Sequence, residues 1–168
     1  MGSERPNKTK KKLIKWITIF VLLVAVPAVY GIYNIFQPVH YPVKFFRGEV
    51  VQVTDALLLG PYPTEKEMKY LKRLGVTEII SLLDPSLPFE APLIRQEKRL
   101  AEKNNLGFRN APLSYLPNLE SKENLDQASK LVSYLRNNSN KKYVHCYLGR
   151  HRTTLVKEHY LKEVSQTP

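Results

Sequence analysis

The hydrophobic pattern divides the chain into one long apolar run near the N-terminus and a series of short apolar segments after residue 50. Residues 16–36 contain no charged side chain over about 21 positions, which is long enough for a helix to cross a bilayer. Trp16, Tyr30 and Tyr33 fall toward the ends of this run, where aromatic side chains gather at membrane surfaces. We therefore expect a transmembrane anchor over residues 13–36.

Basic residues flank the apolar run unequally. The N-terminal side carries Arg5 and the lysines 8, 10, 11, 12 and 15, whereas the first stretch on the other side carries only Lys44 and Arg47. By the positive-inside rule the N-terminus stays cytoplasmic, and the chain after residue 36 lies across the membrane, in a periplasm or its equivalent. We expect residues 1–12 to form a disordered basic tail.

Two further expectations concern this N-terminal part. Residues 37–47, which include Pro38 and Pro42, are expected to be a linker. A signal peptide cleaved near Ala28 is the alternative to an anchor, because small residues occur there. The apolar run continues past that point, so an uncleaved anchor is favoured.

Short apolar runs alternate with amphipathic segments from residue 48 onward. The runs predict strands at residues 51–53, 57–59, 76–83, 108–113 and 143–145. Helical periodicity and capping signals predict helices after Thr64, over residues 92–105, from Ser121 and over residues 153–163. This order predicts one α/β domain over residues 48–168, with a mainly parallel central sheet and helices on both faces. A ligand site would lie at the carboxyl ends of its strands.

Composition narrows the possible partners. The formal net charge is +11, to which the first 15 residues contribute about +5. A basic surface suits anionic ligands. No nucleic-acid-binding module or basic–aromatic repeat appears, so nucleic acid is not an expected partner. No His/Asp/Glu spacing typical of a metal site appears either, and we expect neither a metal nor a cofactor.

The only cysteine of the chain follows the last predicted strand and precedes the last predicted helix. Five residues separate Cys146 from Arg152, Gly149 lies between them, and the hydroxyl of Thr153 follows. Backbone N–H groups of such a loop can converge on a tetrahedral anion at the helix N-terminus. The same field favours a nucleophilic thiolate at Cys146, although a lone cysteine is otherwise most often a small buried hydrophobe. Arg152 can hold two phosphate oxygens bidentately.

The pattern His145-Cys146-x-x-Gly149-x-x-Arg152-Thr153 resembles the signature of the cysteine-dependent protein tyrosine and dual-specificity phosphatases. Residues 53–64, 71–76 and 79–83 also resemble the opening of dual-specificity phosphatase domains, so the resemblance covers about residue 51 to the C-terminus. It implies a phosphotyrosine phosphatase-like fold. It also implies hydrolysis of phosphate monoesters, in phosphotyrosine or dual-specificity substrates, through a phosphocysteine intermediate.

The resemblance assigns a role to each matching residue. Cys146 would attack phosphorus, and Arg152 would bind the substrate and the transition state. Thr153 would hydrogen-bond the sulfur and ease its departure, while His145 would tune the thiolate from behind the loop. The phosphorylated protein or small phosphate ester would be held by Tyr147, Leu148, Gly149, Arg150, His151 and Arg152.

The family pattern also implies an aspartate general acid about 30 residues before the cysteine, and here the pattern is incomplete. The matching segment, residues 114–118, has no carboxylate. Glu120, Glu123 and Asp126 are nearby, but they are expected to be solvent-exposed near a helix N-terminus. Asp84, directly after a predicted strand, is the tentative general acid, with a turn-forming role as the alternative. Without an acid, the enzyme would favour good leaving groups such as those of aryl phosphates or pyrophosphates.

Other functions remain open at this level. Residues 149–153 resemble the Gly-Lys-His-Arg-Thr version found in atypical dual-specificity phosphatases of the plant and fungal type, some of which act on inositol pyrophosphates. Arg150 and His151 could match such a polyanion, or a phosphoinositide at the membrane. The missing acid, together with the single helix after the loop where the family usually has two, keeps a pseudophosphatase in consideration. A membrane adaptor with a purely structural anion site is a weaker alternative.

Overall fold

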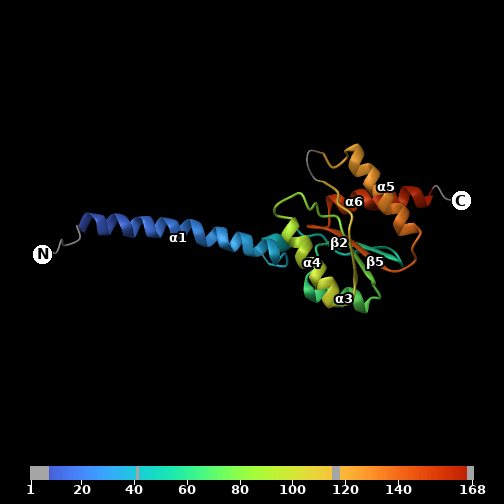
Figure 1. The fold of residues 1–168 in the computed structure, drawn as a ribbon, viewed down its shortest axis with the longest axis horizontal. Coiled ribbons are helices and arrows are strands. Elements are labelled where there is room, and N and C mark those ends of the chain that lie inside the picture. Colours follow the sequence, from blue (N-terminus) through green and yellow to red (C-terminus); the bar gives the residue numbers. More distant parts are fainter. Residues whose placement is uncertain (1–7, 41, 115–117, 166–168) are drawn as a thin grey trace.

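A single long helix projects from an α/β domain in this computed structural model, which describes residues 8–40, 42–114 and 118–165 (Figure 1). The helix, α1, runs from Lys8 to Phe36 with Pro27 inside it. Its Lys10–Phe36 part is long and apolar enough to cross a membrane. The domain buries none of the most apolar stretch of this part. Residues 8–12 are helical, which corrects the expected disordered tail there; residues 1–7 lie outside the described residues.

The domain is built on a five-stranded sheet with the order β1-β2-β5-β3-β4. Only β1 pairs antiparallel with its neighbour, and the other three pairings are parallel, so the prediction of a mainly parallel sheet is confirmed. All five residues of the central strand β5 are buried. The strands are β1 Val51–Thr54, β2 Leu57–Pro61, β3 Glu78–Ser81, β4 Gly107–Asn110 and β5 Lys142–Cys146.

Helices cover both faces of the sheet, as the sequence predicts (Figure 1). On one face α3 (Glu65–Arg73) and α4 (Ala91–Lys103) pack on Leu58 and Tyr143. On the other, α5 (Lys122–Arg136) and α6 (His151–Ser165) pack on Leu59 and Val144. Successive residues of β2 and β5 thus enter opposite cores, because side chains alternate along a strand.

Two of the predicted helix starts have the expected capping hydrogen bonds. Thr64 and Glu67 form a reciprocal capping box at the start of α3, and the Ser121 hydroxyl accepts from the N–H of Asn124 at the start of α5. Leu74 is exposed, because the helix ends at Arg73 and the chain turns there.

The described residues 37–40 and 42–47 pack on the domain, although the sequence suggested only a linker. They include the short helix α2, Val43–Phe46. The guanidinium of Arg47 donates to both carboxylate oxygens of Glu67 at 2.7 and 2.6 Å, and to the carbonyl of Tyr62 at 2.8 Å. Directly after it, the N–H of Gly48 donates to the carbonyl of Leu148 at 2.8 Å. The segment is therefore fixed at the edge of the loop that follows β5.

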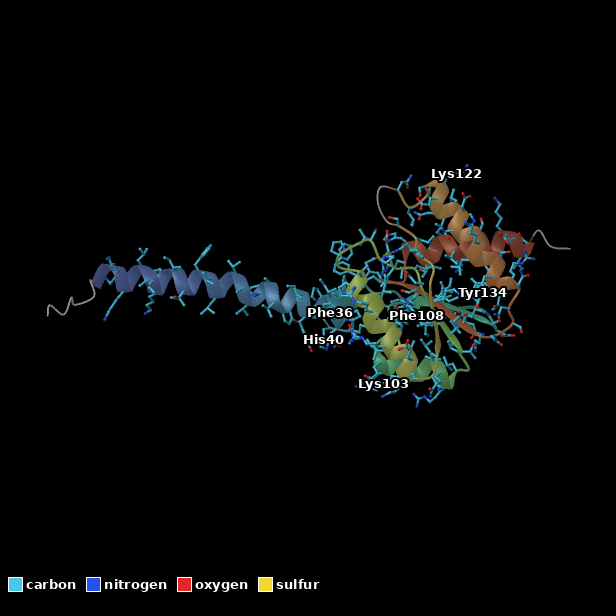
Figure 2. The ribbon with its side chains drawn as sticks, in the orientation of Figure 1. Phe36, His40, Lys103, Phe108, Lys122 and Tyr134 are labelled. Atoms are coloured by element: carbon cyan, nitrogen blue, oxygen red, sulfur yellow. The ribbon has the colours of Figure 1, made fainter. Side chains whose placement is uncertain are left out.

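The C-terminal end of α1 also packs on the domain, where Phe36 lies beside the α/β body and His40 lies just beyond the helix (Figure 2). Ile35 and Phe36 contact a small buried cluster of Tyr62, Leu83 and Leu93. The last turn of α1 is therefore in contact with the domain.

Candidate active site

Cys146 is the last residue of β5, at the carboxyl edge of the sheet and in its centre. Its partner in β2 is Pro61, and the preceding His145 is paired with Ser81 of β3. The cysteine side chain is buried. Strand β5 thus delivers the cysteine to the place where ligands bind in parallel α/β sheets.

The 146–152 loop makes a tight turn that requires glycine. Gly149 has φ +69°, and a Cβ atom there would lie 2.3 Å from the backbone nitrogen of Pro61. A side chain would be both strained and in collision with the backbone of β2. Glycine at position 149 therefore permits this backbone path.

The carbonyl groups of this loop bind the surrounding scaffold. The Tyr147 carbonyl accepts from the N–H of Tyr62 at 3.1 Å, and the Leu148 carbonyl accepts from Gly48. Within the described residues, the backbone N–H groups of residues 147–150 and 152 make no bond to a main-chain carbonyl. Helix α6 begins at His151. A loop with free N–H groups at the N-terminus of a 15-residue helix suits a tetrahedral anion.

Arg152 lies at the inner end of the loop and is 5% exposed. Its Nη1 donates to Glu90 Oε2 at 2.9 Å and to the carbonyls of Leu82 and Leu113 at 3.0 and 3.3 Å. Its Nη2 donates to Glu90 Oε1. Among the described residues, Nε and the second proton of Nη2 find no acceptor. The guanidinium is thus held along one edge, and its other edge is available for two oxygens of a bound anion.

Glu90 is a site residue that the sequence analysis missed. It precedes α4 and is buried, and the same carboxylate also accepts from the N–H of Asp84 at 2.6 Å. Burial alone would lower the pKa of Arg152, but the hydrogen bonds and charge of Glu90 raise this pKa above its ordinary value. Arg152 therefore carries its charge at any working pH.

Glu97 is a second carboxylate that the sequence analysis missed. It lies in α4 against His145, with Oε1 in contact with Nε2, and both side chains are completely buried. The His145 ring stacks on Tyr143 at 5.7 Å between ring centroids and meets the edge of Tyr62 at 5.8 Å. These contacts hold His145 in the core next to Cys146, and its influence on the thiolate stays a prediction.

A signal for both carboxylates is present in the sequence. Glu97 lies four residues after Leu93 and four before Ala101, so it occupies the buried stripe of α4. Glu90 lies directly before α4, three residues before the buried Leu93. An acidic residue on an apolar helix face indicates a buried cation opposite it, because an unpaired buried charge is costly.

Thr153 is buried in the first turn of α6. Its hydroxyl donates to the carbonyl of Arg150 at 3.1 Å. A hydroxyl has one proton, so donation to Cys146 Sγ requires the hydroxyl to rotate away from this carbonyl. The expected hydrogen bond to sulfur is therefore not formed in this state of the protein.

Asp84 lies just beyond β3, close to Arg152, and is 8% exposed. Its Oδ1 accepts from the N–H and the hydroxyl of Ser86 at 2.9 and 2.7 Å, which is the arrangement of a turn-forming aspartate. Burial acts to raise its pKa, but hydrogen bonds from Ser86 and Ser114 and the charge of Arg152 outweigh burial, so the pKa is lowered. A general acid needs a proton to give, and a lowered pKa works against that role.

The other acid candidates lie farther along the chain. Glu120, Glu123 and Asp126 are exposed, as expected. In the segment 114–118, which corresponds to the acid-bearing loop of the family, residues 115–117 lie outside the described residues. In the described part of the chain, no group of three His, Cys, Asp or Glu side chains is placed to hold a metal ion.

A pocket of about 360 Å³ opens in front of Cys146 and Arg152. Besides the loop itself, apolar residues form most of its wall, and they come from two parts of the chain, the end of α1 and residues 87–93. The lining residues are Ile35, Leu87, Phe89, Glu90, Leu93, Cys146, Tyr147, Leu148, His151 and Arg152. Arg150 is exposed at the outer side of the loop.

No protein-family model and no curated protein sequence matches the chain, but several solved structures do. A candidate phosphatase of the DUF442 type from Shewanella putrefaciens CN-32 is 20% identical, with a TM-score of 0.56 over 71% of this chain and 74% of that one. The core catalytic domain of the PP-IP phosphatase SIW14 from S. cerevisiae is 15% identical, with a TM-score of 0.58 over 72% and 70%. TpbA from P. aeruginosa is 14% identical, with a TM-score of 0.54 over 71% and 66%.

At these identities the likeness establishes the fold. The cysteine motif, the sheet order and the position of the loop agree with it. The chain has the fold of the cysteine-dependent protein tyrosine and dual-specificity phosphatases.

Proposed function

We propose that the protein is a membrane-anchored, cysteine-dependent phosphatase that hydrolyses phosphate monoesters through a phosphocysteine intermediate. One observation carries this proposal. Cys146 and the free edge of Arg152 lie on one loop in which the N–H groups of residues 147–150 and 152 bond no main-chain carbonyl of the described residues, and this loop lines a pocket. A nucleophile, a fixed cation and an anion cradle are the parts that phosphoryl transfer to sulfur requires.

The geometry supports the following sequence of steps. The loop N–H groups and Arg152 bind the three terminal oxygens of the phosphate. The Cys146 thiolate attacks phosphorus from the opposite side to the leaving oxygen, forming the P–S bond as the P–O bond breaks. Water then attacks phosphorus, the P–S bond breaks, and inorganic phosphate leaves with the thiolate restored. Because Arg152 is held in place by Glu90 before substrate arrives, no reorganisation is needed at the transition state.

Proton delivery to the leaving oxygen is the least defined step. Asp84 is near the site, but its lowered pKa and its bonds to Ser86 favour a structural role. We therefore expect good leaving groups to be preferred, such as the phenolate of phosphotyrosine or the phosphate of a pyrophosphate. Two alternatives follow from the same observation: an inositol pyrophosphate phosphatase, with Arg150 and His151 facing the extra phosphates, or a pseudophosphatase that binds phosphorylated partners with little turnover.

The membrane arrangement is part of the proposal. The excess of lysine and arginine before the apolar stretch of α1 favours a cytoplasmic N-terminus and an extracytoplasmic catalytic domain. Alkaline phosphatase and green fluorescent protein fused separately at the C-terminus test this orientation. Phosphatase activity without fluorescence is expected, and the reverse result would overturn the orientation.

The catalytic proposal is tested with the full chain in detergent micelles, beside Cys146→Ser and Arg152→Lys. The substrates are p-nitrophenyl phosphate, a phosphotyrosine peptide, an inositol pyrophosphate and a phosphoinositide. We expect turnover by the natural chain and a labelled phosphoenzyme that disappears in Cys146→Ser. Turnover that survives the serine substitution would refute the mechanism. Binding of the phosphopeptide with no turnover of any substrate would establish the pseudophosphatase alternative.

A further inference from the structure

The pocket in front of Cys146 has a wall that belongs to the membrane helix. Ile35, the second-last residue of α1, lines this pocket together with Phe89 and Leu93 of the domain. The hydroxyl of Tyr147, in the 146–152 loop, donates to the carbonyl of Ile35 at 3.1 Å. The anchor therefore does more than tether the domain, because its last turn is part of the site that holds the substrate.

The pocket also lies at the membrane surface if α1 spans the bilayer. From Trp16 to Ile35 an α-helix rises by about 30 Å, which matches the thickness of the hydrocarbon core. Lys15 precedes this stretch, and the next charged residue is Lys44. Ile35 thus falls where the helix leaves the hydrocarbon, so the pocket opens at the level of the lipid headgroups.

Exposed aromatic side chains occur on the pocket wall and on α2. Phe45 and Phe46 of α2 are 76% and 56% exposed, and Phe89, which lines the pocket, is 55% exposed. Helix α2 is held next to the loop by the bond from Gly48 to Leu148. Apolar side chains with a nearby lysine are typical of surfaces that lie in the membrane interface.

We propose that the substrate is a membrane lipid with a terminal phosphoryl group, whose hydrocarbon chain lies in the pocket formed by Ile35, Phe89 and Leu93. This inference rests on the proposed phosphatase chemistry. A soluble phosphoprotein would have to approach between the domain and the bilayer. A lipid phosphate is already at headgroup level, and its chain continues the apolar surface of α1. The apolar wall directly beside Cys146 fits a chain attached near phosphorus better than the polar ring of a phosphoinositide.

The chemistry favours a lipid diphosphate over a lipid monophosphate. Cys146 would attack the terminal phosphorus, the P–S bond would form, and the bridging P–O bond would break. The bridging oxygen leaves with its electron pair as part of a lipid monophosphate, which is stable without an added proton. Water then cleaves the P–S bond and releases inorganic phosphate, losing its proton to solvent. This step needs no acid, in agreement with the bonding of Asp84 to Ser86.

The test measures chain-length dependence on the full chain in detergent micelles. The probes are dimethylallyl, geranyl and farnesyl diphosphate and farnesyl monophosphate, with p-nitrophenyl phosphate as the reference and a phosphoinositide as the competitor. We expect kcat/KM to rise at least about tenfold from the shortest to the longest diphosphate, since each buried methylene is worth roughly a factor of four. Farnesyl diphosphate should be faster than the monophosphate. Equal kcat/KM values for all chain lengths, or faster hydrolysis of the phosphoinositide than of farnesyl diphosphate, would overturn the proposal.

Pocket variants separate a specific site from general partition into micelles. Ile35→Trp fills the pocket and should bring the farnesyl-to-dimethylallyl ratio close to one, and Phe89→Ala, on the domain side, should lower the same ratio. Ile32→Trp is the matched control, because Ile32 lies on α1 but not in the pocket, and it should keep the preference. A preference that persists in both pocket variants would refute the proposed site.

The same compounds distinguish failure of this inference from failure of the phosphatase chemistry. The Cys146→Ser chain cannot form a phosphocysteine, so its affinity for the three diphosphates reports on the pocket alone. Affinity that does not change with chain length would overturn the lipid site even if p-nitrophenyl phosphate is hydrolysed by the natural chain. Affinity that rises with chain length while no compound is hydrolysed would support the lipid site and refute the catalytic proposal.

Discussion

The carboxylate of Glu90 binds both terminal nitrogens of Arg152, in a pair that is almost completely buried. This pair joins the start of α4 to the first turn of α6 across the carboxyl edge of the sheet. It fixes the anion-binding edge of the guanidinium toward the pocket. Loss of one partner would leave the other as an uncompensated buried charge.

Glu90→Ala should therefore destabilise the protein by about 3–5 kcal/mol and reduce turnover. Thermal unfolding and kcat/KM measured on the same detergent-solubilised preparation check both effects. Glu102→Ala is the matched control, because Glu102 is on the same helix but exposed. Equal losses for the two variants would show that the buried pair has no special importance.

The contact between Glu97 and His145 predicts energetic coupling behind the nucleophile. Either single substitution to alanine should cost about 3–5 kcal/mol, since each leaves a buried polar or charged group without a partner. The double substitution should cost clearly less than the sum of the two. Thermal or chemical unfolding of the natural chain, the two single variants and the double variant measures the four free energies of unfolding. A loss in the double variant equal to the sum of the two single losses would contradict the coupling.

Gly149→Ala should abolish activity, because the new Cβ would lie 2.3 Å from the backbone of Pro61 and push the 146–152 loop out of shape. Gly75 offers a matched control. It also has a positive φ, +87°, but a Cβ there meets nothing nearer than 4.0 Å. Gly75→Ala should cost about 1–2 kcal/mol of stability from backbone strain alone and leave kcat/KM intact. Similar catalytic losses in both variants would refute the argument from collision.

The lowered pKa of Asp84 makes two pH-dependent predictions. A carboxyl whose pKa is lowered in the folded state stabilises the protein above its unfolded pKa of about 3.9, and this contribution disappears as pH falls through the folded value. The stability advantage of the natural chain over Asp84→Asn should therefore shrink as pH is lowered below about 4. The basic limb of the pH–rate profile should be the same in both proteins. A basic limb that disappears in Asp84→Asn would identify Asp84 as the general acid after all.

Local patterns in the sequence were enough to predict much of this molecule. The apolar run, the capping box at Thr64 and the order of strand, loop and helix around Cys146 all depend on residues a few positions apart. Hydrophobic periodicity and capping are properties of single elements, so they can be recognised without a fold. The parallel sheet followed because helices alternate with strands, and it places the loop after β5 at the ligand-binding edge.

Pairings between distant residues required the tertiary structure. Glu90 and Glu97 are separated from Arg152 and His145 by 62 and 48 positions, and only the packing of α4 against the sheet edge brings them together. Likewise, Tyr147 and Ile35 are 112 positions apart, and nothing in either segment indicates their hydrogen bond. The sequence determined the motif from His145 to Thr153, because its residues are close neighbours along the chain. The fold decided which buried carboxylates contact Arg152 and His145 and that the last turn of α1 forms part of the pocket, because such contacts depend on how whole elements pack.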